Sequence, residues 1–326
     1  GNLTLLAVDV VHDLAIVFND LQSSQHLTIT EDPLSKGERI YSMGNPRDLG
    51  MTIVEGIYNG LVENSRYRKI LFSGSLNPGM SGGPAFNESG EVIGINVSTG
   101  GEQLSFLVPV KHLFSLLATT DHHEPEENVE TLLNEALLTD QNEFYEAMLG
   151  HDWSERQLAD LAVPDKLHES LKCWGHTVDN EDVEHQAVHQ HCKSEDEIFI
   201  SNDLFVGDFD FDVEMIDSKN LNRFQFYNFL EQRFTNRNFG NTYDADEVTN
   251  FACSDDLVTL FSGSWKISTC FRAYKRYTDL YDVSMIMVST DYPHKAAIVK
   301  VAATGISTDN ARAVFKRVMG AISWTH

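Results

Sequence analysis

The run Asn-Pro-Gly-Met-Ser-Gly-Gly-Pro at residues 77–84 constrains the fold more than any other part of the sequence. Three glycines and two prolines in eight residues exclude a helix interior or a central strand, so this run must be a loop. Short stretches rich in Val and Ile, separated by Gly, Pro, Asn and Asp, surround it within residues 1–118. They predict a β-barrel or β-sandwich that carries this loop between two strands.

The strands expected in this region are Leu3–Val8, Leu14–Val17, Arg39–Ser42, Met51–Tyr58, Lys69–Phe72, Glu91–Val97 and Ser105–Val110. A short closing helix is expected at Val110–Leu117.

Ser81 is the candidate nucleophile of the loop. A serine hydroxyl needs a base, a group that orients the base, and hydrogen-bond donors for the oxyanion. Glycine at position 79 permits a backbone conformation that turns its N–H toward the same point as the N–H of Ser81. The loop therefore predicts a nucleophile with an oxyanion hole formed by Gly79 and Ser81. An ordinary glycine-rich turn is the alternative.

Four further segments resemble trypsin-like serine proteases, and within them the HtrA-like (Deg) branch. Gly37–Pro46 resembles the strand and glycine turn that open the second barrel, and Thr52–Ile57 resembles the next strand. Gly90–Asn96 resembles the strand after the nucleophile loop, and Phe106–Val110 the last strand before a C-terminal helix. The resemblance covers about the first third of the chain. It implies an all-β double-barrel protease domain over residues 1–118, with the N-terminal barrel incomplete.

The segment that begins His12-Asp13-Leu14-Ala15 resembles the family's Asp-Leu-Ala strand. The resemblance implies that Asp13 orients the catalytic histidine. The family's histidine precedes this aspartate, but His12 is the sole histidine before Asp13. Adjacent strand residues point to opposite faces, so His12 is not expected to act with Asp13, and His26 is expected in a loop. We therefore expect the histidine upstream of residue 1.

The family resemblance also places the primary substrate pocket at Ser75 and along Val97, Ser98 and Thr99. No acidic residue occupies position 75, so the pocket is not expected to select Lys or Arg. A small or aliphatic side chain before the scissile bond is predicted. The function expected is that of a serine endopeptidase with an acyl-enzyme mechanism, no cofactor, and a protein or peptide substrate. The alternative is a non-catalytic, protease-derived binding or scaffold protein.

The remaining two thirds of the chain resemble no family that we recognise. Residues 119–170 are expected to form a helical connector, with helices at Glu155–Ala162 and Asp165–Cys173 among others. Residues 171–326 are expected to form an α+β accessory domain, with an amphipathic helix at Thr308–Ile322. No PDZ-like carboxylate-binding glycine loop is recognisable there. Docking of a protein partner is the default expectation for this domain.

All four cysteines lie in the second half of the chain. They allow three pairings, of which Cys173–Cys192 with Cys253–Cys270 closes the shortest loops. Two disulfides would indicate a periplasmic or secreted protein. The alternative is four free thiols in a cytosolic protein, as in a viral-type or cytosolic protease.

Charge and side-chain patterns bear on other partners. A formal net charge of −25 disfavours nucleic acid, and no apolar run is long enough to predict a membrane span. His185 and His189 would share a helix face and suggest a metal site, but a solvated acidic segment is the preferred interpretation. Asp208–Asp212 alternates Asp with Phe, which predicts a strand with one polar face rather than a calcium site. No metal is expected.

Overall fold

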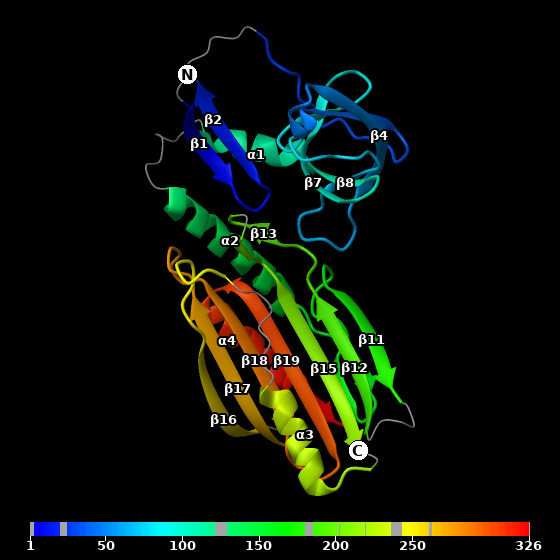
Figure 1. The fold of residues 1–326 in the computed structure, drawn as a ribbon, viewed down its shortest axis with the longest axis vertical. Helices are drawn as coiled ribbons and strands as arrows, with labels where there is room; N and C mark the ends of the chain where they lie inside the picture. The colour runs from blue at the N-terminus through cyan, green and yellow to red at the C-terminus, as the bar shows by residue number, and fades with distance from the viewer. Residues whose placement is uncertain are drawn as a thin grey trace. The chain divides into compact units, whose positions relative to one another are not determined.

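The computed structural model describes residues 3–19, 25–120, 129–179, 185–201, 203–218, 220–235, 243–260 and 263–325. The chain divides into two compact units, Gly1–Leu133 and Asn134–His326, which are called unit 1 and unit 2 below. Figure 1 shows a small barrel with a hairpin in unit 1 and one long sheet in unit 2.

Unit 1 contains a closed barrel with the strand order β3-β4-β5-β8-β7-β6. Its strands are β3 (Arg39–Gly44), β4 (Thr52–Leu61), β5 (Ile70–Phe72), β6 (Pro84–Phe86), β7 (Val92–Gly101) and β8 (Leu104–Pro109). Every neighbouring pair is antiparallel. A 3₁₀ turn at Pro46–Asp48 follows β3. Alternate side chains fill the barrel, among them Ile40, Phe72 and Leu107, which are fully buried.

A separate antiparallel hairpin precedes the barrel. Its strands are β1 (Leu3–Asp9) and β2 (Leu14–Asn19). Helix α1 (Val110–Thr120) follows β8 and lies beside the hairpin (Figure 1). A small apolar cluster joins these elements through Ala7 and Leu14 of the hairpin, Val108 of β8 and Leu116 of α1. The expected strands and the closing helix of unit 1 are thus confirmed, and only the short strand β6 was not expected.

Unit 2 is built on a seven-stranded antiparallel sheet with the order β11-β12-β15-β19-β18-β17-β16. Its strands are β11 (Lys172–Val178), β12 (His185–Lys193), β15 (Phe209–Ser218), β16 (Ala252–Leu260), β17 (Gly263–Ala273), β18 (Tyr281–Ser289) and β19 (Lys295–Ile306). Two small sheets accompany it, β20-β10-β9 and β13-β14. Their strands are β9 (Glu155–Leu158), β10 (Leu161–Pro164), β13 (Ile198–Phe199), β14 (Phe205–Val206) and β20 (Ser323–Trp324).

Helices cover both faces of the large sheet. On one face, Phe209 and Phe211 of β15 pack into the main core with α4 (Thr308–Gly320) and the C-terminal part of α2 (Val129–Leu149). On the opposite face, Ile216 of β15 packs against α3 (Arg223–Thr235). Successive strand residues face opposite sides, which explains why β15 contributes to both cores. The amphipathic C-terminal helix is confirmed.

Two disulfides join the outermost strand pairs of the sheet. Cys173 of β11 pairs with Cys192 of β12, and Cys253 of β16 pairs with Cys270 of β17. In each pair the cysteines lie directly opposite each other in the strand register. These are the sequential pairs expected from the loop lengths, and each fastens one edge of the sheet.

The expectation of helices in the second part of the connector is wrong. Glu155–Ala162 forms β9, a tight turn and the start of β10, and Ala159 in the turn has a left-handed φ of 51°. Asp165–Cys173 contains no helix and leads into β11. Leu158, Leu161 and Val163 point into the main core, so tertiary burial decides this segment over its helical spacing. His185 and His189, considered above on a helix, lie on β12.

Candidate functional site

The Ser81 loop connects β5 to β6 and is bonded along the side of β7. The N–H of Gly82 donates to the carbonyl of Asn96 at 2.9 Å, and the N–H of Asn96 donates to the carbonyl of Gly83 at 2.9 Å. This exchange fixes the chain on the C-terminal side of Ser81. The loop lies at the barrel surface, with Ser81 exposed and Met80 fully buried beneath it.

Asn96 is the buried residue that holds the loop from below. Its Nδ2 donates to the carbonyls of Met43 (3.1 Å) and Met80 (3.0 Å), and its Oδ1 accepts from the hydroxyl of Ser42 at 2.8 Å. The side chain is only 1% exposed, so losing these bonds would leave several buried polar groups unpaired. A role for Asn96 was not predicted from the sequence. An amide inside an otherwise apolar strand was the available signal.

Gly79 takes a backbone conformation that other residues rarely adopt. Its φ is +96°, and a Cβ there would lie 2.4 Å from the carbonyl oxygen of Asn45. The same segment after β3 clamps the loop through two bonds. Asn45 N–H donates to Gly79 O at 3.3 Å, and Arg47 N–H donates to Pro78 O at 2.9 Å. The glycine at position 79 is therefore required both by conformation and by close approach.

The backbone donors around Ser81 differ in how they are satisfied. The N–H of Met80 donates to the carbonyl of Asn77 at 3.0 Å. The N–H groups of Gly79 and Ser81 on either side form no hydrogen bond with any residue that the structure describes. The Ser81 hydroxyl donates weakly to the carbonyl of Val97 at 3.4 Å. Two backbone donors that have no partner among the described residues therefore lie beside an exposed hydroxyl.

The expected substrate-binding residues lie around this loop. Val97, Ser98 and Thr99 continue β7 beyond Asn96, and Val97 accepts the bond from Ser81. Ser75 is exposed one position before Leu76, whose N–H donates to the hydroxyl of Ser105 at 3.1 Å. Because Ser105 pairs with Thr99 across β7 and β8, this bond places the Ser75–Leu76 segment near the end of β7.

Asp13 lies in the tight turn between β1 and β2. Its side chain is exposed, its φ is +56°, and it forms no hydrogen bond or ion pair with the described residues. The next residue, Leu14, packs in the apolar cluster that also includes Val97. The turn that carries Asp13 and the strand that accepts Ser81 therefore pack on the same small cluster. The structure shows no direct bond between Asp13 and Ser81 in the part of the chain that it describes.

His12 is committed to partners other than Ser81. Its Nδ1 lies 2.7 Å from Asp9 Oδ2, and its ring stacks on His112 with centroids 3.6 Å apart. Burial alone would raise the pKa of Asp9, but the His12 bonds and charge lower it overall. Burial and the charge of His12 lower the pKa of His112 to about 4. His12 and Asp13 lie in a turn rather than in a strand, so the expectation that they point to opposite faces of a strand is wrong. The contacts with Asp9 and His112 nevertheless engage the His12 ring away from Ser81. His26 lies in an exposed loop, as expected.

The polar groups noted in the second half lie on the sheet of unit 2. His189 stacks on His176 of β11, and its Nε2 lies 3.3 Å from Glu214. His191 Nδ1 lies 3.4 Å from both Asp210 and Asp212, which is a paired ionic arrangement. Among the described residues, no three His, Cys, Asp or Glu side chains are grouped to hold a metal ion. No helix in the same part of the chain has the length and apolar character of a membrane span.

Comparison with known proteins is informative for unit 1. The family profile of the trypsin-like peptidase domain matches residues 2–95. This part of the chain is therefore similar in sequence to trypsin-like peptidase domains. The chain is 33% identical over 122 residues to the serine protease Do-like HtrB of Bacillus subtilis, covering 32% of this chain and 27% of that protein. It is 28% identical over 123 residues to the serine endoprotease DegS of Haemophilus influenzae, covering 33% of this chain and 36% of that protein.

The matches cover only part of this chain and part of each relative. The chain spans about a quarter to a third of the length of these relatives. Among solved structures, the HtrA-type protease AlgW with tripeptide is 28% identical, with coverage of 37% of this chain and 44% of that chain and a TM-score of 0.35. The sequence matches confirm the resemblance of unit 1 to HtrA-type serine proteases, and the family profile covers both Asp13 and Ser81.

Proposed function

We propose that this protein is a serine endopeptidase in which Ser81 attacks the substrate carbonyl. A histidine removes the hydroxyl proton as the Oγ–C bond forms, and the N–H groups of Gly79 and Ser81 stabilise the resulting oxyanion. The histidine then protonates the leaving amine as the C–N bond breaks. Water hydrolyses the acyl-enzyme with the same histidine as base. Asp13 orients the histidine and stabilises its charged form.

The observation that carries this proposal is the pair of unsatisfied N–H groups beside an exposed serine hydroxyl. Both residues are exposed, so water satisfies these N–H groups in the free protein, and a substrate oxygen can take its place. Here the positive φ of Gly79 and the buried bonds of Asn96 hold both donors in place. Preorganised donors of this kind are what an oxyanion requires.

The mechanism needs a histidine that the described residues do not supply to Ser81, and we propose that it comes from chain preceding residue 1. The β1–β2 hairpin supports this. Leu3, Val17 and Phe18 on its strands are 68%, 49% and 54% exposed. A two-stranded hairpin with exposed apolar residues is marginal alone and is expected to be covered by further strands. Those strands would complete the first barrel and carry the histidine toward Asp13.

Substrate preference and compartment follow from the same residues. Ser75, Ser98 and Thr99 bring no carboxylate to the expected pocket, so we propose cleavage after small or aliphatic residues. Two disulfides favour an oxidising compartment. Relatives such as the DegP-like periplasmic serine endoprotease of Halomonas elongata, 32% identical over 116 residues, carry the compartment in their name. We propose a periplasmic or secreted location.

The proposal is tested with the natural full-length protein, including any sequence that precedes residue 1. Treatment with a fluorophosphonate bearing an aliphatic side chain should label one peptide, that containing Ser81. The Ser81→Ala variant should lose both the label and peptide hydrolysis, whereas the matched Ser98→Ala variant should keep the label. Folded protein without a Ser81 adduct would refute the peptidase and favour a protease-derived binding protein. Cleavage only after Lys or Arg would refute the proposed specificity.

A further inference from the structure

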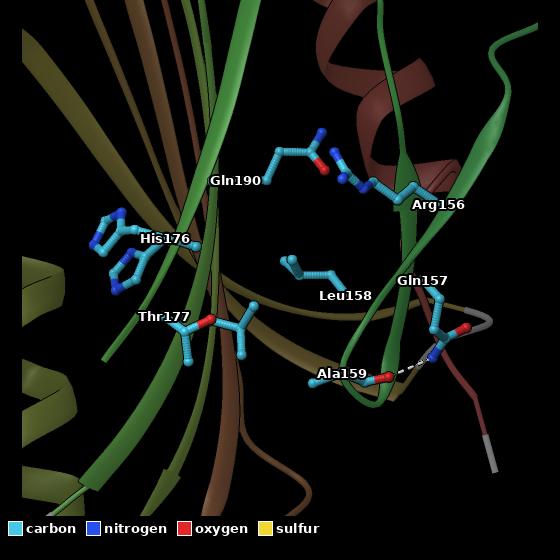
Figure 2. Close-up of a pocket in the computed structure, with 10 residues that line it drawn as sticks. Arg156, Gln157, Leu158, Ala159, His176, Thr177 and Gln190 are labelled. Carbon is cyan, nitrogen blue, oxygen red and sulfur yellow. Dashed lines mark hydrogen bonds between the residues drawn. The ribbon is translucent and has the colours of Figure 1, made fainter. Parts of the chain in front are cut away.

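A polar hollow of about 310 Å³ lies in unit 2. Its walls are the β9–β10 hairpin on one side and the paired strands β11 and β12 on the other (Figure 2). Arg156 from β9 points across the hollow toward Gln190 of β12, and Leu158 lies below it between the two walls. The His176 ring lies on the opposite side of the strands and takes no part.

Gln190 is a buried amide with one half unsatisfied. Its side chain is 1% exposed, and Nε2 donates to the carbonyls of Pro164 at 2.7 Å and Asp165 at 3.2 Å. These two acceptors fix the orientation of the amide. Its Oε1 is buried without a hydrogen-bond partner among the described residues. A buried acceptor without a donor has a substantial free-energy cost, so a ligand donor beside Oε1 would be favoured.

The floor of the hollow opens toward the edge of the sheet at Gly175. This residue lies opposite Gln190 in the register, and its missing side chain leaves the space beside the amide unfilled. A Cβ added at this position would lie 2.8 Å from the carbonyl oxygen of His189, so glycine is required here and no side chain of β11 occupies this point. A side chain arriving from outside β11 can therefore pass over Gly175 toward Gln190.

Strand β11 has a free edge next to this opening. Within the described residues, β11 is hydrogen-bonded to β12 alone. The Cα atoms of Cys173 and Cys192 are 4.0 Å apart, which identifies a non-hydrogen-bonded pair. Gly175 and Thr177 follow at two-residue intervals and belong to the same class. The N–H and C=O groups of these residues therefore point away from β12, toward the free edge.

We propose that the β11 edge and the adjoining hollow bind an extended peptide that places a glutamine side chain between Arg156 and Gln190. The peptide pairs with the backbone of Cys173, Gly175 and Thr177 as an added strand. A residue opposite Gly175 lies about two strand spacings, roughly 9–10 Å, from the backbone of Gln190. Two long amide side chains span that gap, whereas a short side chain does not. This proposal does not rest on the peptidase activity proposed for unit 1.

The charges of the hollow favour a carboxamide over a carboxylate. The Arg156 guanidinium can donate to a ligand oxygen, and Gln190 Oε1 can accept from a ligand N–H. A carboxamide supplies both groups. A carboxylate could accept from Arg156, but it would also place a negative oxygen beside the unpaired acceptor Gln190 Oε1. In addition, Asp165 Oδ1 already lies 3.3 Å from Arg156 Nη1 and balances the arginine charge. Glutamine is therefore preferred to glutamate.

The test measures fluorescence anisotropy of labelled pentapeptides with the full chain carrying Ser81→Ala, so that hydrolysis does not interfere. The reference peptide alternates Val and Thr around a central Gln. Replacing this Gln by Glu or norleucine should weaken binding about tenfold or more, because a buried polar pairing is lost. Two peptides that are N-methylated on alternate sets of backbone nitrogens should differ at least tenfold in affinity. The weaker one carries the methyl groups on the N–H set that faces β11. Equal affinities in either comparison would overturn the proposal.

Protein variants locate the site. Arg156→Met keeps the aliphatic stem and should weaken binding of the Gln peptide about tenfold. Thr177→Pro removes an outward N–H without breaking the ladder to β12, and it should also abolish binding. Arg312→Met, an exposed arginine on α4, is the matched control and should bind as the parent does. Thermal unfolding checks that each variant is folded. Folded Arg156→Met and Thr177→Pro proteins with parental affinity would refute the site.

Discussion

The Ser81 loop of unit 1 and the polar network around Asp282 of unit 2 differ in how their hydrogen-bonding groups are satisfied. At the loop, the N–H groups of Gly79 and Ser81 have no partner among the described residues, and both residues are exposed. In unit 2, Asp282 is 3% exposed and accepts bonds from Arg272 at 2.7 Å and Tyr274 at 2.5 Å. The exposed donors of the Ser81 loop are available to bind a ligand, whereas the buried groups around Asp282 pair with one another and stabilise the core.

The Asp282 network also fastens a distant segment of the chain. The Arg272 guanidinium lies 4.6 Å from the ring centroids of Tyr243 and Phe251, which follow α3. The N–H of Gly305 adds a further bond to Asp282 at 3.3 Å. Burial raises the pKa of Asp282, and its hydrogen bonds and Arg272 oppose that shift. The network is therefore a stability element of unit 2.

The largest effect is expected for Asp282→Ala. Removing the carboxylate leaves the Arg272 charge buried and without its counter-ion, which should lower the free energy of unfolding of unit 2 by about 3–5 kcal/mol. All four tryptophans lie in unit 2, so urea unfolding followed by tryptophan fluorescence reports this unit. Labelling of Ser81 by a fluorophosphonate should remain at the parental rate. Loss of labelling in a protein whose unit 2 is still folded would show that the Asp282 network also supports the Ser81 loop, contrary to the comparison.

The next effect is expected for Gly79→Ala. The left-handed φ and the 2.4 Å approach to Asn45 O force the loop to move, so one oxyanion donor is displaced. Peptide hydrolysis should fall by about 10²–10³-fold in kcat, with unit 2 unchanged. Gly90→Ala is the matched control, because Gly90 has a φ of +80° but open space around its Cβ position. It should cost about 1 kcal/mol of stability and leave kcat near the parental value. Equal losses in both variants would contradict the account.

The smallest effect concerns pH. Burial and the His12 charge lower the pKa of His112 to about 4, so the unfolded chain binds a proton that folded unit 1 excludes between about pH 6.5 and 4. The free energy of unfolding of unit 1 should therefore fall by about 1 kcal/mol as the pH drops over this range, after allowance for the partial exposure of His112. In unit 2, burial lowers the pKa of His189 to about 4, but burial raises that of Asp210 to about 6, and protonation of Asp210 offsets the loss.

Hydrogen exchange measured at about pH 7 and pH 5 distinguishes the units. Exchange in α1 and β1 should accelerate at the lower pH, after correction for intrinsic rates, more than exchange in β15 and β19. His112→Gln should remove most of this difference. A steeper loss in unit 2, or no change with His112→Gln, would show that other groups control acid stability.

The sequence predicted unit 1 well because its signals are local. The strands are short, glycines and prolines mark their ends, and the Ser81 loop carries its own conformational requirements at Gly79. What the sequence did not predict at the site was the support for the loop. Asn96 reaches the carbonyls of Met43 and Met80 from a different strand, so its role depends on long-range pairing.

Unit 2 was predicted less well because its elements are specified by distant partners. Residues 155–162 have helical spacing but form strands, since Leu158 and Leu161 are buried in a core made by β15, β19 and α4. Residues 185–193 contain many polar side chains, yet they form a strand between β11 and β15. Helix α4 was predicted correctly because its apolar face is a local feature of the sequence, whereas its Ser307 cap is seen in the structure.

The account depends most directly on where the oxyanion of the reaction lies. A crystal structure of the full-length protein after reaction with an aliphatic fluorophosphonate would show this position. We expect a covalent bond from Ser81 Oγ to phosphorus, with one phosphoryl oxygen about 2.7–3.1 Å from the backbone nitrogens of both Gly79 and Ser81. An adduct on another residue, or a phosphoryl oxygen directed away from both nitrogens, would contradict the account.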